Sequence, residues 1–123
     1  MSYADERPPV WVGHVVMKTN RLTASWDFMK IGLRPIELHE NVGILELRGG
    51  THLVLAQSDS VPPGPAPFDL MVDDLEETHR LFTEIGLAPS PIVVGSIHRS
   101  FTVEDPSEQQ ISFNSSHLSG KPV

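Results

Sequence analysis

The chain has 123 residues, enough for one domain that buries about two-thirds of the surface of its unfolded state. Nine Lys and Arg stand against sixteen Asp and Glu, and this formal charge of −7 argues against nucleic acids and anionic membranes as partners, because both require a basic surface. There is no cysteine, which excludes a disulfide framework, a thiolate metal site and a cysteine nucleophile.

The N-terminal sequence MSYADERPP is polar and lacks the apolar segment of a signal peptide. No apolar run further along the sequence approaches the roughly 20 residues that a membrane-spanning helix needs. We therefore expect a cytoplasmic protein that does not enter a membrane.

The first half of the chain predicts a strand and a helix. Apolar residues alternate over residues 10–18, with Val12, His14 and Val16 on one face, which is typical of a strand. A helix follows, ended by Gly32, in which Ser25 is expected to face outward. Its apolar stripe recurs at helical spacing and consists of Leu22, Trp26 and Met29.

Three further strands complete this half. A short strand is expected over residues 34–38, and the hydrophobic segment 44–57 reads as a hairpin. Gly49-Gly50 lies between its two apolar runs and is typical of a two-residue hairpin loop.

The second half predicts the same order of elements after a proline-rich linker. Residues 58–67, SDSVPPGPAP, are too rich in proline for regular structure. A strand over 68–72 leads into a helix that Asp73 or Asp74 can cap, with Leu75, His79 and Phe82 on its buried stripe. Strands are expected near 89–94 and 97–104, and DPSEQQ turns the chain into a last strand at 110–114.

The two halves read as copies of one unit. IGLRP at 31–35 and IGLAP at 85–89 are 54 residues apart and occupy the same place after each helix. Self-similarity at such a period indicates one supersecondary unit used twice. We expect one α+β domain made of two βαβββ modules, about 10–57 and 67–115, that form a concave mixed sheet with helices on the outer side.

The doubled unit, opened by GHVVMK and closed by a DP-turn hairpin, resembles the vicinal oxygen chelate superfamily over residues 10–115. This group includes glyoxalase I, extradiol dioxygenases, fosfomycin-resistance enzymes and bleomycin-binding proteins. The resemblance implies a ligand cleft on the concave face of the sheet and frequent pairing into dimers. It does not by itself imply one reaction, because unrelated chemistries and simple ligand binding share this fold.

The resemblance also implies where a divalent metal would bind, because catalytic members use inward-facing positions on the first and fourth strands of each module. By register these positions are His14, Val54, Pro67 (or Phe68 in the alternative alignment) and Ser112. Only His14 is a competent ligand, whereas a catalytic metal needs about three. We therefore expect that the usual four-residue set is absent and that no metal is held in the usual way.

A displaced site is an alternative. His52 shares a face with Val54, and Asp69 shares a face with Pro67, so His14, His52 and Asp69 are expected on the concave side. Two imidazoles and a carboxylate suit Zn, Fe, Mn or Ni, with His14 and His52 as the core of the set. The other interpretation is that both histidines line the cleft or are hydrogen-bonded without a metal.

Other residues are expected to line the cleft and bind a small organic ligand. The polar candidates lie on the last strand and the apolar ones on the opposite side, and together they are Gln110, Ser112, Asn114, Leu45, Leu47 and Val54. Gln110 and Asn114 can alternatively face solvent at the rim. His98 and His117 flank the final hairpin; we expect exposed side chains there, with a contribution of His117 to a site left open.

The predicted function is binding of a small organic molecule in the cleft, with His14, His52 and Asp69 orienting or protonating it. The alternative is a metal-dependent lyase, isomerase or dioxygenase with the displaced site, and a third hypothesis is a protein that only sequesters its ligand. Free strand edges also predict a homodimer, since exposed edges are normally paired or covered.

Overall fold

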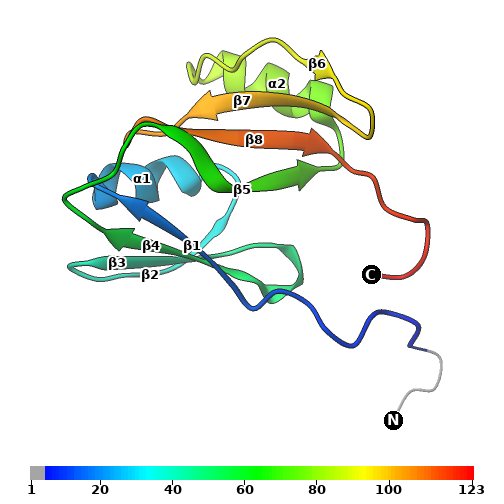
Figure 1. Cartoon of the computed structure of the whole chain (residues 1–123), viewed down its shortest axis with the longest axis horizontal. Coiled ribbons are helices and arrows are strands. Elements are labelled where there is room, and N and C mark those ends of the chain that lie inside the picture. The colour runs from blue at the N-terminus through cyan, green and yellow to red at the C-terminus, as the bar shows by residue number, and fades with distance from the viewer. Residues whose placement is uncertain (1–4) are drawn as a thin grey trace.

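Two βαβββ modules make up the computed structural model, which describes residues 5–123 (Figure 1). The first module consists of β1 (His14–Thr19), α1 (Leu22–Met29), β2 (Arg34–Leu38), β3 (Val42–Glu46), a 3₁₀ turn η1 (Arg48–Gly50) and β4 (His52–Gln57). The second consists of β5 (Gly64–Val72), α2 (Leu75–Glu84), β6 (Val93–Val94), β7 (Arg99–Glu104) and β8 (Gln109–Ser115). The predicted α+β class and the doubled module are confirmed.

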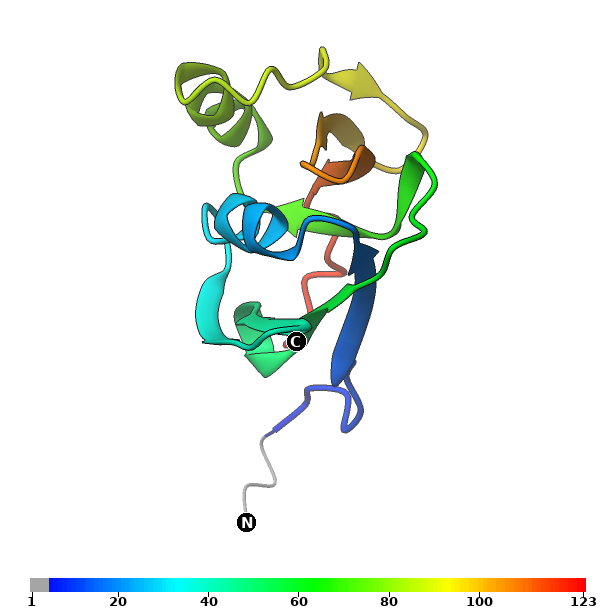
Figure 2. The same cartoon turned by 90° about the vertical axis from the view of Figure 1, so that its left-hand side faces the viewer.

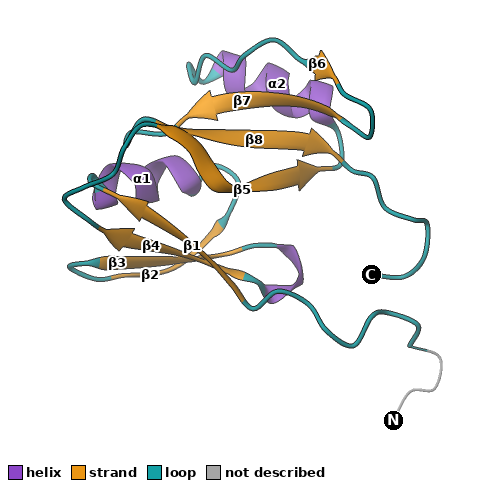
Figure 3. Ribbon diagram, viewed as in Figure 1, coloured by secondary structure: helices purple, strands orange, loops and turns teal. Residues whose placement is uncertain are grey.

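The strands form two mixed four-stranded sheets with the same internal order (Figure 3). The first sheet runs β1-β4-β3-β2 and the second runs β5-β8-β7-β6. In each sheet the first and last strands of the module pair in parallel, β1 with β4 and β5 with β8, and the other pairs are antiparallel. The edge strands β1 and β5 lie near each other where the modules meet.

One face of each sheet is buried and the other is open. Along β1 and β4 the residues Met17, Leu53 and Leu55 are fully buried and turn towards α1, whose stripe of Leu22, Trp26 and Met29 covers them. Along β7 and β8 the buried residues Phe101, Val103, Ile111 and Phe113 turn towards α2. Figure 2 shows α1 lying between its own sheet and the second module. All these side chains belong to one continuous core.

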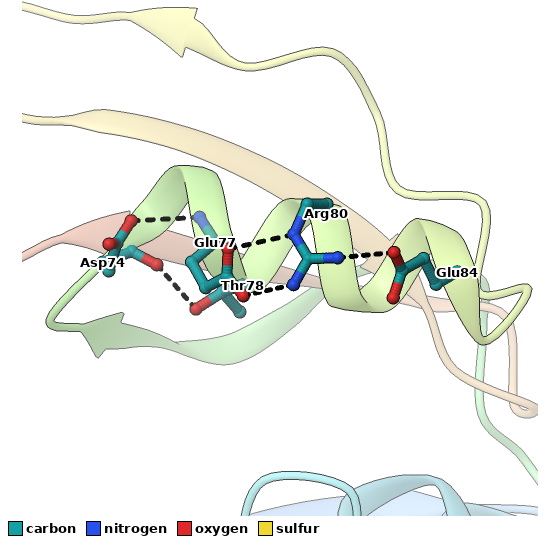
Figure 4. A network of polar contacts seen from close by, with 5 residues as sticks. All are labelled: Asp74, Glu77, Thr78, Arg80 and Glu84. Carbon is teal, nitrogen blue, oxygen red and sulfur yellow. Dashed lines mark hydrogen bonds and ion pairs between the residues drawn. The ribbon is translucent and has the colours of Figure 1, made fainter.

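The helix α2 is well specified by local interactions (Figure 4). Asp74 is its N-cap, and its carboxylate accepts a 3.0 Å hydrogen bond from the backbone N–H of Glu77. Arg80 then pairs with both Glu77 and Glu84 one turn away on either side, which raises the pKa of its guanidinium. Capping and pairing of this kind stabilise a helix whose apolar stripe is narrow.

The hairpin between β3 and β4 differs from the prediction by one residue. Leu47 N–H donates to the carbonyl of Thr51, so the loop holds three residues, Arg48 to Gly50, and not two. Both glycines have a positive φ, 83° and 91°, a conformation that glycine adopts without steric cost. The register that follows pairs Glu46 with His52.

The proline-rich segment is shorter than predicted, because β5 already begins at Gly64 and includes Pro65 and Pro67. Proline lacks the N–H that a ladder needs, and it is tolerated here because β5 is the edge strand of its sheet. The register with β8 is irregular between Pro65 and Asp69 and regular from Asp69 onwards.

A buried polar network joins the two modules. Ser25 on α1, predicted to face outward, is fully buried and donates a 2.7 Å hydrogen bond to Asp105 in the turn between β7 and β8. Gln109 Nε2 in turn donates to the carbonyl of Lys18 on β1, at 2.6 Å.

Within residues 5–123 no helix has the length and apolar character that crossing a membrane requires.

Candidate functional site

The open face of the first sheet is built from alternate residues of β1, β3 and β4. Its register puts His14 beside His52 and Val16 beside Val54, and it puts Ile44 and Glu46 across from Val54 and His52. We call this set the first open face: His14, Val16, Ile44, Glu46, His52 and Val54. His14 and Val16 are exposed, and the others are partly buried.

Leu45 and Leu47 do not belong to this face, so their predicted place in the cleft is wrong. Leu45 is 0% exposed and pairs with the core residue Leu53, and Leu47 packs against the same core. The physical reason is the three-residue hairpin loop, because a shift of one residue in register turns every side chain of a strand to the other face. Ile44 and Glu46 take the places predicted for the two leucines.

A row of three polar side chains forms the chemically distinctive part of the first open face. The rings of His14 and His52 are edge to face with centroids 6.0 Å apart. His52 Nε2 lies 3.1 Å from Glu46 Oε2, and the other oxygen of Glu46 accepts a 2.9 Å hydrogen bond from Arg34. With Nε2 donating to Glu46, the Nδ1 lone pair of His52 is left for a ligand.

Glu46 is the functional candidate that sequence reasoning missed. It lies in the segment ILELRGGTHL, six residues before His52, and pairing across a loop of three residues would have placed the two side by side.

The open face of the second sheet carries a hollow with a volume of about 470 Å³. Its lining comes from the two neighbouring strands β5 and β8 and consists of Pro65, Ala66, Pro67, Phe68, Asp69, Gln110 and Ser112. Asp69 and Ser112 are paired across the two strands, so a carboxylate and a hydroxyl lie side by side. This volume and this mixture of apolar and polar groups are typical of a site for a small organic molecule.

The other predicted residues of the last strand divide into two cases. Gln110 is partly buried, and its amide nitrogen makes two long contacts, 3.5 Å to Glu104 and 3.4 Å to the carbonyl of Glu108, which leave the amide oxygen for a ligand. Asn114 points to the same face but is only 2% exposed, so it does not lie at a solvated rim. His14 and Ser112 both turn away from the helices, as the alternation of their strands predicted.

The side chains present do not fit the metal that the fold family implies. Val54 and Pro67, at two of the four expected positions, offer no donor atom, and Ser112 offers only a hydroxyl. Over residues 5–123, no three His, Asp or Glu side chains gather closely enough to hold one ion. Asp69 therefore does not join His14 and His52, and the displaced three-residue site is not assembled within this chain.

One ion pair links the hairpin of the first module to the end of β5. Arg48 contacts Asp73 through both terminal nitrogens of its guanidinium, Nη2 at 2.8 Å and Nη1 at 3.1 Å. The hydrogen bond from Arg48 lowers the pKa of the Asp73 carboxyl below its ordinary value. Asp74 and not Asp73 caps α2, so the two neighbouring carboxylates have different roles.

This architecture, with one open face on each module, is the fold of the glyoxalase, bleomycin resistance protein and dioxygenase superfamily. A lactoylglutathione lyase from Agrobacterium tumefaciens is similar with a TM-score of 0.76 at 17% identity, over 94% of this chain and 100% of that one. A bleomycin resistance determinant encoded on transposon Tn5 is similar with a TM-score of 0.71 at 14% identity, over 89% and 100%.

A bleomycin-binding protein solved in complex with bleomycin is also similar, with a TM-score of 0.68 at 13% identity, over 87% of this chain and 98% of that one. No protein-family model matches the sequence, and no curated protein matches it. At these identities the likeness shows the fold alone.

Proposed function

We propose that this protein belongs to the glyoxalase and bleomycin resistance group and binds a small organic molecule on its open faces without the group's usual metal. The observation that carries the proposal is the hollow on the second open face, where Asp69, Ser112 and Gln110 lie among prolines and Phe68. Apolar side chains interleaved with a few placed polar groups bind an organic ligand and fix its orientation.

The charge of the site favours a ligand with a positive group. The chain carries a net charge of −7, and Asp69 is exposed on the hollow, where its carboxylate has no hydrogen bond or ion pair with another side chain among residues 5–123. A hydrogen bond to a charged group contributes about 1.5–3 kcal/mol. Bleomycin is the first probe, because a bleomycin-binding protein of the same fold is solved in complex with it.

The first open face favours a second role, proton transfer to or from the bound molecule. His52 is held by Glu46, and an imidazole oriented by a carboxylate is a suitable general base or acid near neutral pH. Mass spectrometry of the probe after incubation distinguishes the two roles: an unchanged probe supports sequestration alone, and a product lost in His52→Ala supports catalysis.

We also propose that the protein works as a homodimer. The chain exposes 8028 Å², whereas a monomer of 13.6 kDa typically exposes about 6,600 Å². An apolar segment near the N-terminus is among the exposed parts: Val10, Trp11 and Val12 are 80%, 69% and 57% exposed. Such a segment is expected to be covered by a partner. Light scattering at micromolar concentration should give about twice 13.6 kDa.

Calorimetric titration of bleomycin into the untagged protein tests the binding proposal. We expect Asp69→Asn to weaken binding about tenfold or more, because a charged hydrogen bond is lost. Asp59→Asn is the matched control, since Asp59 is exposed in the linker and away from both open faces. Amide shifts in an NMR titration should map to β5 and β8. Shifts confined to other elements, or equal effects of the two variants, would contradict the proposal.

A further inference from the structure

Two histidines that are far apart in the sequence meet at one end of the second sheet. His98 precedes β7 and His117 follows β8, yet their ring centroids are 5.4 Å apart and their planes differ by only 24°. Neither residue belongs to the hollow or to the first open face. The pair therefore needs an explanation of its own.

Neighbouring contacts show which way this pair faces. Arg99 turns towards the helix side of the sheet, where it pairs with Glu76 of α2. Side chains alternate along a strand, so His98 and Ser100 turn to the open side. Ser100 is the cross-strand partner of Asn114, which brings the Asn114 side chain to the same corner. Because Arg99 is neutralised by Glu76, its charge does not oppose a cation there.

This corner contains two buried polar atoms without a partner. Within the described part of the chain, His98 Nδ1 and Asn114 Oδ1 are the side-chain nitrogen and oxygen atoms that are buried and contacted by no donor or acceptor. Leaving such an atom unsatisfied costs about 1–3 kcal/mol. The Asn114 oxygen is an acceptor, and His98 Nδ1 has a lone pair when the ring proton is on Nε2, so a cation satisfies both atoms, whereas an anion would leave the Asn114 oxygen unpaired.

The separation of the rings also suits a shared ion. A ring nitrogen about 2.1 Å from a tetrahedral ion puts each ring centroid about 3.2 Å from it, so two imidazoles on one ion have centroids about 5.2 Å apart. The centroids of His98 and His117 are 5.4 Å apart, but the two rings are stacked, so the exposed ring of His117 must turn about its side-chain bonds before both rings point a nitrogen at one ion. For His14 and His52 the centroid separation is 6.0 Å, which requires a wider angle at the ion.

We propose that His98, His117 and Asn114 form a binding site for a divalent ion of the late first transition row. Imidazole nitrogen is a preferred donor for Zn²⁺, Ni²⁺ and Cu²⁺, and Cu²⁺ binds such donors most tightly. An ion here would fasten the segment after β8 to the start of β7. The site is distinct from the positions that the fold family uses, and the inference is independent of the ligand proposed for the hollow.

The test is a calorimetric titration of CuCl₂ and of ZnCl₂ into untagged full-length protein in a non-coordinating buffer. We expect one ion per chain at this site, bound more tightly for Cu²⁺. His117→Ala and His98→Ala should each weaken ion binding at least tenfold. Replacement of a residue that only hydrogen-bonds to a metal ligand already lowers metal affinity about 10–100-fold. His117 is exposed and outside the strands, so its replacement should leave the circular dichroism unchanged.

Matched histidine variants locate the ion. His39→Ala, at an exposed histidine paired with Glu37, should bind as the wild type does, and so should His52→Ala. Electron paramagnetic resonance of the Cu²⁺ protein should show two equivalent nitrogen ligands that are lost in His98→Ala. Retention of binding in both His98→Ala and His117→Ala, or its loss only in His52→Ala, would overturn the proposal.

Discussion

Removal of the Asp105 carboxylate should destabilise the protein more than its place in a turn suggests. The residue is 3% exposed and accepts four hydrogen bonds. Oδ1 accepts from Ser107 N at 3.0 Å, Ser107 Oγ at 2.7 Å and Gln109 N at 3.1 Å, and Oδ2 accepts from Ser25 Oγ at 2.7 Å. The last of these bonds crosses from one module to the other.

The magnitude follows from the groups that would be left without a partner. In Asp105→Ala the hydroxyls of Ser25 and Ser107 and the backbone N–H groups of Ser107 and Gln109 lose the buried carboxylate that accepts from them. Each such group costs about 1–3 kcal/mol, and disruption of a buried charged network usually costs about 3–5 kcal/mol in all. We expect a loss of about 3–5 kcal/mol, a large part of the 5–15 kcal/mol or so that a domain has.

The variant Asp105→Asn distinguishes the contribution of the negative charge from that of the hydrogen bonds. It retains an oxygen at the Oδ1 position for the three bonds of the turn, and its amide can donate to Ser25, whose hydroxyl then donates to Thr19. We expect this variant to lose only about 1–2 kcal/mol, since one charge-assisted bond becomes a neutral one.

Urea unfolding followed by circular dichroism measures both variants. With a slope of about 1–3 kcal/mol/M, the midpoint of Asp105→Ala should fall by about 1–5 M. Glu104→Ala is the control, because Glu104 is the exposed neighbour of Asp105 and should change the free energy of unfolding by less than about 0.5 kcal/mol. The reasoning is refuted if Asp105→Ala loses less than about 1 kcal/mol, or if the alanine and asparagine variants are equal.

Three further substitutions test the packing and the electrostatics. Leu45→Ala should cost about 2–5 kcal/mol in urea unfolding, because Leu45 is fully buried in the core and not in the cleft. Gly43→Ala should cost about 1–3 kcal/mol, since a Cβ there would lie 2.9 Å from a ring carbon of Trp26. Arg48→Ala should raise the pKa of Asp73 towards 3.8 in an NMR titration, because the bond that lowers it is removed. The Arg48–Asp73 pair stabilises the folded protein at a pH above the pKa that Asp73 has in the unfolded chain. This stabilisation disappears as the pH falls through the lower pKa that Asp73 has in the folded protein.

Each of these predictions has a matched control. Val54→Ala removes a side chain from the open face and should cost less than Leu45→Ala. Gly13→Ala adds a Cβ with no atom within 4 Å and should be nearly neutral. Arg34→Ala removes a different exposed arginine and should leave the pKa of Asp73 unchanged. If Val54→Ala lowered the free energy of unfolding more than Leu45→Ala, the strand register would be misassigned. If Gly13→Ala lowered it more than Gly43→Ala, the packing around Trp26 would be misassigned.

The sequence by itself determined the order of the elements and most of the buried stripe of each helix. Leu22, Trp26 and Met29 repeat at helical spacing. Residues alternate along β1, β4 and β8, so local periodicity placed His14, His52 and Ser112 on the face that turns away from the helices. These properties depend on neighbours within one element, which is why they can be read from the sequence. Because the IGL segment recurs after each helix, the order of elements predicted for the first module also predicted that of the second.

Only the tertiary structure decided which residues meet across elements. One extra residue in the loop before Thr51 put Ile44 and Glu46 on the open face in place of Leu45 and Leu47. The two glycines alone did not distinguish a two-residue from a three-residue loop. Pro65 became part of a strand because its edge position, set by the pairing with β8, needs no N–H. Asp105 and Ser25, 80 residues apart, and His98 and His117 came together because the modules and strands pack in three dimensions. No local pattern encodes such contacts, since each depends on the packing of segments distant in the sequence.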